Sequence, residues 1–280
     1  MGKCEERRMG LWELDQPPYI PWLYEAHSQG DAFFAHSNML IHGAREKVSI
    51  LHLEEKDPSE APYRWDHKFT IEPRFNVEGT TGAVTCDSIF LVGGLKNPHE
   101  GRRMDLKTEE WTPLPQLKEG RIDAASMMWD PHIYFILGGR DSSGRSLFSC
   151  EYLDTRTGVW FPFSRKIPLP LSGHAVTAYN DHAYISGGFS DGESRDEVWR
   201  CRISEQGPWD QLPSLKFKRH DHGMIEDGSG GLSVISGCYQ YREKTKAVLE
   251  METLTLGEQG EWETVGRLPF LNLFKATEMK

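Results

Sequence analysis

The sequence of 280 residues predicts an all-β fold built from repeated four-stranded antiparallel sheets. Short apolar runs that end in glycine recur along the chain. Their glycine-type positions, near residues 43, 93, 138, 187 and 236, are 45 to 50 residues apart. Five tryptophans keep the same phase, at spacings of 46, 49, 49 and 53 residues: Trp65, Trp111, Trp160, Trp209 and Trp262. No segment shows the periodicity of an amphipathic helix longer than a few turns, so strands are expected throughout.

The first two strands of each repeat are predicted to form a hairpin. An apolar piece, a tight polar turn and the glycine run follow one another, as in residues 175–179, Asn180-Asp181 and residues 183–188. Runs of this length bounded by Asn, Asp, Ser and Gly are typical of paired antiparallel strands. The same order predicts hairpins at the turns Ser37-Asn38 and Asp87-Ser88.

A polar loop and two further strands complete each repeat. The third strand is predicted at residues 48–53, 149–154 and 197–203, and the tryptophan strand is the fourth. A four-stranded unit of about 50 residues cannot bury both faces of its own sheet, so the units must stack radially as the blades of a β-propeller. Glycine doublets let neighbouring blades approach closely, and tryptophans fill the wedge between blades. We therefore interpret the doublets and Trp111, Trp160 and Trp209 as structural.

Five complete repeats divide the chain. They are predicted at about 32–71, 80–117, 123–170, 174–215 and 222–269, between an N-terminal segment 1–31 and a closing strand 270–280. Residues 12–18 resemble a tryptophan strand and residues 273–279 resemble a first strand. Together they could supply two strands of an incomplete sixth blade. Alternatively, the ring closes with five blades.

Composition and charge narrow the function classes. The 42 acidic residues exceed the 32 basic ones, and the net charge of −10 opposes non-specific binding to nucleic acid or anionic membranes. The five cysteines are never closer than 37 positions and form no CxxC pair, so we expect reduced thiols, no metal ion and no cofactor. No apolar run is long enough for a signal peptide or a membrane span. These observations predict a cytoplasmic protein.

The repeat resembles the kelch repeat. A glycine doublet closes a strand, a tryptophan follows about 20 residues later, and Leu-Pro comes next, as at Leu114-Pro115, Leu212-Pro213 and Leu268-Pro269. The resemblance covers about residues 32–280 and is strongest to the propeller of kelch-like proteins. In those, BTB and BACK domains recruit a cullin-type ubiquitin ligase while the propeller holds the substrate. The resemblance implies a non-enzymatic protein-interaction module, the substrate-recognition part of a ligase adaptor.

Some features depart from the family pattern. Kelch repeats usually place a tyrosine on the third strand, and here only Tyr152 does so. The first repeat has Gly43-Ala44 and the fifth has Ser236-Gly237 where a doublet is expected. About 31 residues precede the first repeat, too few for BTB and BACK domains. We therefore expect a cullin ligase as a partner only if a longer form carries those domains, and this chain could be an isoform or a fragment.

Two other function classes stay open. Binding to actin or another cytoskeletal protein fits the same fold and differs from adaptor function only in the partner. The enzyme alternative comes from oxidases and sugar mutarotases built on kelch-type propellers. A copper oxidase of that kind would need a cluster of Tyr, His and Cys ligands and an export signal, which cannot be placed in this sequence.

By the resemblance, the binding face is made by the loops after the doublets and by the connections between blades. The charges of these segments sum to +4, which predicts attraction of an acidic partner segment. Kelch-like propellers often bind substrate through arginines at the start of a blade's first strand. The matching residues are Arg74, Arg121 and Arg219, with Leu171 in the fourth repeat.

Further candidates come just after the doublet positions, and Tyr and Arg are enriched at binding hot spots. They are Arg140, Arg145, Tyr239, Tyr241 and Arg242. Two histidines and an aspartate, His220, Asp221 and His222, hint at a metal or acid-base site, but no neighbouring pattern supplies the further ligands that a stable metal site needs. We therefore predict partner-binding residues and no metal ligands.

Overall fold

The computed structural model describes residues 32–36, 39–44, 47–52, 67–70, 75–85, 87–205, 207–226, 230–241, 244–257 and 260–267. These residues form 24 strands and no helix. It follows that the described part of the chain has no helix able to span a membrane.

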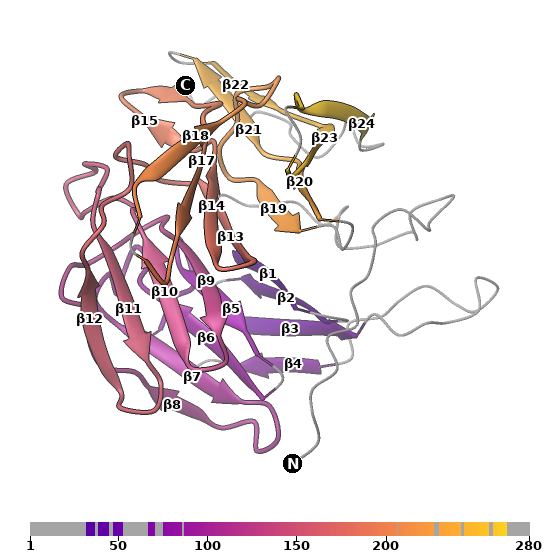
Figure 1. The fold of residues 1–280 in the computed structure, drawn as a ribbon. Coiled ribbons are helices and arrows are strands. Elements are labelled where there is room, and N and C mark those ends of the chain that lie inside the picture. The colour runs from indigo at the N-terminus through magenta and orange to yellow at the C-terminus, as the bar shows by residue number, and fades with distance from the viewer. Residues whose placement is uncertain are drawn as a thin grey trace.

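Five sheets of four antiparallel strands follow one another along the chain (Figure 1). The first sheet contains β1 (Ala32–His36), β2 (Met39–Ala44), β3 (Lys47–His52) and β4 (His67–Thr70). The second contains β5 (Thr81–Val84), β6 (Ser88–Val92), β7 (Gly101–Asp105) and β8 (Trp111–Pro113). The third contains β9 (Ala125–Asp130), β10 (Ile133–Leu137), β11 (Cys150–Asp154) and β12 (Val159–Phe163).

The last two sheets have the same design. The fourth contains β13 (Ala175–Tyr179), β14 (His182–Ser186), β17 (Val198–Arg202) and β18 (Trp209–Leu212), and the fifth contains β19 (Gly223–Glu226), β20 (Gly231–Ile235), β23 (Glu250–Thr255) and β24 (Glu263–Arg267). The first strands contact one another in the order β1, β5, β9, β13, β19, so the sheets are blades around one axis. The predicted all-β propeller is confirmed. The five sheets fall within the five predicted repeats, whereas residues 12–18 and 273–279 lie outside the described residues.

The glycine doublets bring neighbouring blades into contact. Gly187 has a φ of 54°, and a Cβ atom there would lie 2.5 Å from the carbonyl oxygen of Arg219 in the next blade. The N–H of Gly188 donates a hydrogen bond of 2.8 Å to the same carbonyl. In the fifth blade Ser236 occupies the first doublet position and keeps a φ of 63°, a conformation that is uncommon for a residue with a side chain.

Three of the repeat tryptophans join their blades to the blades before them. Trp160, Trp209 and Trp262 donate indole N–H bonds of 2.9, 2.9 and 2.8 Å to carbonyls in the connections that leave the preceding blades. Trp160 also packs against Tyr134 between the second and third blades. Trp160 buries its ring and Trp209 is half-buried, and both satisfy their N–H groups within the propeller, as the structural interpretation predicts. Trp111 is half-buried and packs against the core of the second blade, but the described residues supply no hydrogen-bond partner for its N–H group.

Three backbone hydrogen bonds link the starts of four successive blades. The N–H of Asp123 donates to Gly79, that of Gly173 to Asp123, and that of Asp221 to Gly173, at 2.7 to 2.8 Å. We call these four positions the inner ring. All four have φ between 52° and 69°, although two of them are aspartates. The ring therefore locks the starts of the second to fifth blades together through main-chain atoms.

A sixth sheet lies outside the blades. Its strands are β15 (Phe189–Ser190), β16 (Glu193–Ser194), β21 (Cys238–Tyr241) and β22 (Lys244–Ala247), and they come from the loops after the fourth and fifth doublets. Glu193 pairs with Tyr241 across the two loops, and the N–H of Gln240 donates to Ser194 Oγ at 2.7 Å. We call this element the loop sheet. Polar loops were predicted here, and the structure joins two of them into one unit.

The three described cysteines form no disulfide with one another. Cys150 and Cys201 are buried, and Cys238 is half-buried. Burial raises the pKa of Cys150 to about 12, so the neutral thiol is its stable form.

Candidate functional site

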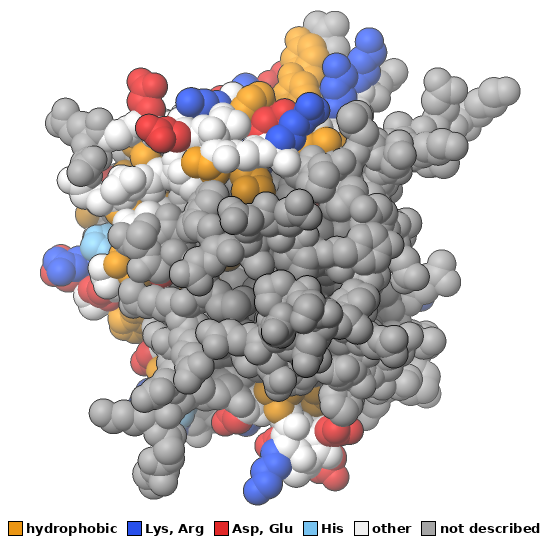
Figure 2. Space-filling model, turned by 90° about the vertical axis from the view of Figure 1, so that its right-hand side faces the viewer, with side chains coloured by type: hydrophobic (Ala, Val, Ile, Leu, Met, Phe, Trp, Pro, Cys, Tyr) orange, Lys and Arg blue, Asp and Glu red, His pale blue; other side chains and the backbone are white. Residues whose placement is uncertain are grey.

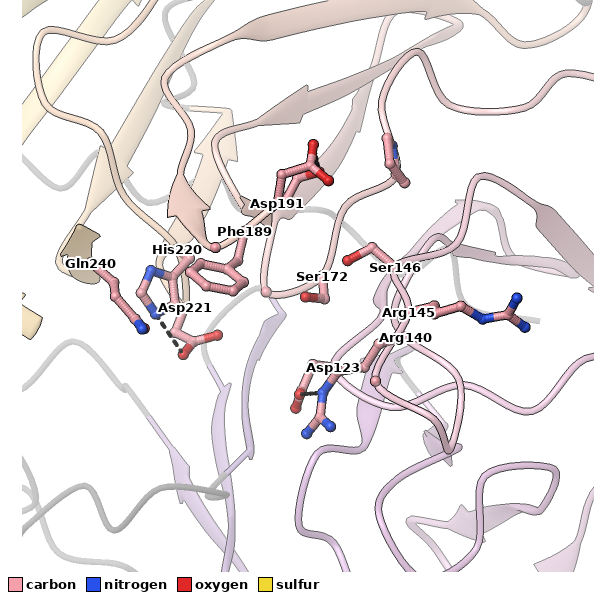
Figure 3. Close-up of a pocket in the computed structure, with 15 residues that line it drawn as sticks. Asp123, Arg140, Arg145, Ser146, Ser172, Phe189, Asp191, His220, Asp221 and Gln240 are labelled. Atoms are coloured by element: carbon pink, nitrogen blue, oxygen red, sulfur yellow. Dashed lines mark hydrogen bonds and ion pairs between the residues drawn. The ribbon is translucent and has the colours of Figure 1, made fainter. Parts of the chain in front are cut away.

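A cavity of about 640 Å³ opens among the loops of the third, fourth and fifth blades (Figure 3). Its walls come from the loop after the third doublet, the loop sheet, and the connections that lead into the fourth and fifth blades. The volume lies in the range of pockets that bind small molecules.

Backbone pairs fix the loops that surround the cavity. In each of three blades, the residue after the doublet pairs with a residue just before the first strand: Arg140 with Ile122, Phe189 with Ser172, and Cys238 with His220. The cavity walls are thus anchored to the propeller at the base of each loop. A binding surface held in this way loses little conformational entropy when a ligand binds.

One side of the cavity carries two arginines. Arg140 donates from Nε to Asp123 Oδ2 at 2.7 Å, and both side chains are about one-third exposed. Arg145 is 83% exposed and forms an ion pair of 2.8 Å with Asp141. Hydrogen bonds from the Ser143 hydroxyl and the Arg145 backbone hold the pKa of Asp141 below its usual value. Both predicted arginines therefore line the cavity, each with a carboxylate partner.

The opposite side carries Phe189, His220, Asp221 and Gln240 (Figure 3). The rings of Phe189 and His220 lie 5.3 Å apart, and His220 Nδ1 shares a hydrogen bond of 2.9 Å with Ser194 Oγ. The Asp221 carboxylate is 61% exposed and lies 3.7 Å from His220 Nε2. Although this carboxylate is exposed, the surrounding loop atoms displace part of its hydration, and this effect and the nearby Asp123 raise the pKa of Asp221; burial lowers the pKa of His220.

Arg121 and Arg219 were predicted to bind a partner on the loop face, and the structure places them elsewhere. Both guanidinium groups are fully buried, and they form ion pairs with Glu151 at 3.1 Å and with Glu252 at 2.6 Å. Each also donates to two backbone carbonyls of its own blade. These two arginines therefore hold their blades together and do not face the cavity. Two of the four net positive charges expected on the loop face are neutralised in this way.

The remaining predicted residues lie at the loop sheet or outside the described chain. Tyr239 is half-buried and Tyr241 is 43% exposed, and they pair with Lys246 and Lys244 across the β21–β22 hairpin. Figure 2 shows Lys and Arg side chains beside hydrophobic ones along the upper edge of the molecule, at the height of β21 and β22 in Figure 1. Arg74 and Arg242 lie outside the described residues.

Asp123 and Asp221 were not predicted as partner-binding residues, although the sequence holds a signal for them. Asp123 and Asp221 occupy positions of the inner ring where the second and fourth blades have Gly79 and Gly173. An alignment of the repeats would place an aspartate in a glycine position twice. A side chain that stands where the fold prefers glycine is a reasonable functional candidate.

The histidines beside the axis support the structure. His222 Nε2 shares a hydrogen bond of 2.8 Å with Ser186 Oγ, whereas His220 contacts Ser194. His174 and His222 pack over Gly138 and Gly187 of the preceding blades, where a Cβ atom would collide with their rings. Within the described part of the chain, no group of three His, Cys, Asp or Glu side chains has the arrangement of a metal site.

We expect the free energy of unfolding to fall as the pH drops from about 6.5 towards 3. Burial lowers the pKa of His174 to about 3, and burial together with Arg219 lowers that of His222. The unfolded chain then binds protons that the folded protein does not, so stability present above pH 6.5 is lost below it. For His174 the loss at pH 5 is about 2 kcal/mol, measurable by urea denaturation between pH 7.5 and 4.5.

The control compares how steeply the free energy of unfolding depends on pH in two variants. His174→Leu should flatten the slope, whereas His132→Gln, at an exposed turn, should keep it. An identical slope in His174→Leu and the unmodified protein would contradict the prediction.

Comparison with known proteins supports the prediction of kelch repeats. No family model matches the chain. The chain is 25% identical over 199 residues to spermatocyte protein spe-26 of Caenorhabditis elegans, covering 68% of this chain and 33% of that protein. It is 26% identical over 175 residues to kelch-like protein 41b of Danio rerio, covering 55% and 29% of the two chains. An F-box/kelch-repeat protein of Arabidopsis thaliana is 31% identical over 118 residues, with 41% and 29% covered.

The fold has a matching solved structure. The structure of YjhT superposes with a TM-score of 0.69 at 13% identity, and the match covers 86% of this chain and 84% of that one. The chain spans about a third of the length of the curated relatives it matches. These likenesses agree with the repeat pattern and with the blades described above.

Proposed function

We propose that this kelch-repeat β-propeller is a protein-interaction module that holds a segment of a partner protein in the cavity of its loop face. The observation that carries the proposal is the cavity itself, walled by loops of three blades. Backbone pairs anchor those loops, and the loop sheet joins two of them. A rigid scaffold that presents charged and aromatic loop residues is a common way to build a recognition site.

The relatives support this class of function. One is named as a kelch-like protein and another as an F-box/kelch-repeat protein. By its resemblance to kelch-like proteins, we propose that the propeller holds a cytoplasmic substrate protein for a cullin-type ubiquitin ligase recruited by other domains. The partner then corresponds to the ligase substrate, and this chain contributes recognition rather than catalysis.

The test is partner recovery by a variant with a blocked cavity. Ser146 lines the cavity and is half-buried, so Ser146→Trp would place an indole in the space that a partner segment needs. We expect proteins captured from cells by the unmodified chain to be recovered about tenfold less well, which corresponds to a loss of about 1.4 kcal/mol in binding. Quantitative mass spectrometry of the captured proteins measures the ratio.

The matched control carries the same substitution on the opposite rim. Thr157 lies in the exposed turn between β11 and β12, and antiparallel pairing places that turn at the other end of the blade from the doublet loop. Thr157→Trp should leave recovery unchanged. Equal recovery by both tryptophan variants and the unmodified chain would refute the use of this cavity.

A further inference from the structure

We propose that the cavity receives a basic side chain of the partner, with its ammonium or guanidinium group on the Asp221 carboxylate beside the Phe189 ring. The inference rests on the proposed function, because it names the chemistry of the segment that the same cavity would hold. It reverses the expectation of an acidic partner.

The ion pairs of the cavity leave one carboxylate without a cationic partner. Arg140 is paired with Asp123, and Arg145 is paired with Asp141. Asp191, at the rim, is paired with Arg195 at 3.3 Å. For Asp221, the described residues supply no lysine or arginine within ion-pair distance. His220 Nε2 lies 3.7 Å from its carboxylate, and the charge of Arg140 acts on it from a longer distance. Asp221 is therefore the cavity carboxylate without an ion-pair partner, and its ionised form gives the cavity an unbalanced negative charge.

Asp221 is fixed in a position where it can reach a ligand. Its N–H belongs to the inner ring, and its φ of 52° is one that residues other than glycine adopt infrequently. Its carboxylate is 61% exposed and lines the cavity. The backbone thus holds an accessible carboxylate at the axis instead of turning it towards the sheets.

Phe189 adds a second element of cation recognition. Figure 3 shows Phe189 and Asp221 on the same side of the cavity, next to His220. The ring is half-buried and tilted by 54° against the His220 ring. An aromatic face attracts a cation, and the methylene groups of a Lys or Arg side chain can pack along the same ring. A carboxylate beside an aromatic ring suits a basic side chain better than an acidic one.

A bound cation would also change the ionisation of Asp221. The surrounding loop atoms displace part of the hydration of its carboxyl group, and this effect and the like charge of Asp123 raise its pKa, whereas Arg140 lowers it. A bound cation would offset both effects by stabilising the ionised form. Arg121 and Arg219, two of the arginines on which the prediction of an acidic partner rested, already have carboxylate partners inside the blades.

The test is a selection of peptides from a random 12-residue display library on the full chain. Peptides that are enriched should share a Lys or Arg at one position, and replacing that residue by Ala should weaken binding. Asp221→Asn should raise the Kd of these peptides about tenfold or more, because it removes a charge-assisted hydrogen bond. Fluorescence anisotropy with labelled synthetic peptides measures the Kd. Asparagine tolerates positive φ, so the variant is expected to fold.

The control and the outcomes separate this inference from the proposed function. Asp210→Asn removes a carboxylate that is also 61% exposed, but on β18 at the outer edge of the fourth blade, and it should leave the Kd unchanged. Peptides that lose binding to Ser146→Trp but bind Asp221→Asn normally would overturn the inference and keep the cavity as the binding site. Enrichment of acidic peptides would do the same. Peptides that bind Ser146→Trp normally, or a library without binders, would count against both.

Discussion

Replacing Arg219 with leucine is expected to lower the free energy of unfolding by about 3–5 kcal/mol. The substitution leaves the Glu252 carboxylate, which is fully buried, without the guanidinium group that now lies 2.6 Å away. It also removes the donors to the carbonyls of Ser236 and Glu250. An unpaired buried charge costs far more than a surface ion pair contributes, so this is one of the largest effects expected in the chain. Equilibrium denaturation in urea measures it.

The fourth blade supplies the control for that experiment. At the positions equivalent to Arg219 and Glu252 it has Leu171 and Trp199, because Leu171 accepts the same inter-blade bond and Trp199 has the same strand register. The double variant Arg219→Leu with Glu252→Trp should recover much of the stability lost in the single variant. If the single variant is as stable as the unmodified protein, Glu252 is not held by this ion pair.

The second large effect is expected for Gly187→Ala, with a loss of about 2–5 kcal/mol. A left-handed conformation costs alanine about 1–2 kcal/mol, and overpacking adds about 1–3 kcal/mol. The added Cβ would lie 2.5 Å from the backbone carbonyl of Arg219, which cannot move without disturbing the adjacent blade. Thermal and urea denaturation should both show the loss.

Gly158→Ala separates the two contributions. Gly158 has a φ of 66° but no atom within 4 Å of an added Cβ, so it carries the conformational cost alone. We expect a loss of about 1–2 kcal/mol there. Equal losses at both glycines would show that the contact between blades contributes nothing, and the doublet would then be a turn and not a blade junction.

The fold was predictable because its determinants repeat. The glycine doublet and the tryptophan strand each recur several times at nearly constant spacing, so an irregular copy such as Ser236-Gly237 does not hide the pattern. The hairpin at Asn180-Asp181 was predictable for a local reason, since both residues adopt positive φ and join β13 to β14. Period and turn chemistry are properties of short segments, and a sequence displays them directly.

The site was less predictable because its determinants are distant pairs. The burial of Arg121 depends on Glu151, which lies 30 residues away, and the burial of Arg219 depends on Glu252, which lies 33 residues away. The loop sheet needs Glu193 and Tyr241 to meet across two blades. A resemblance transfers the position of an arginine but not the carboxylate that faces it. A comparison of the repeats within the chain would have helped to predict these buried pairs, because the fourth blade lacks both the Arg and the Glu and has Leu171 and Trp199 in their positions.

At the inner ring, the side chains that could contact a ligand at the propeller axis are distinct from the main-chain groups that hold the blades together. Its hydrogen bonds use only N–H and C=O groups, so the fold requires a main-chain conformation at these positions and is indifferent to much of the side chain. Gly, Asp and Asn are the residues that tolerate this conformation best. A single substitution at an inner-ring position can therefore change the chemical group at the axis, from glycine without a side chain to the amide of Asn or the carboxylate of Asp, while the blades stay in place. A designer could use the same freedom to give one scaffold a series of ligands.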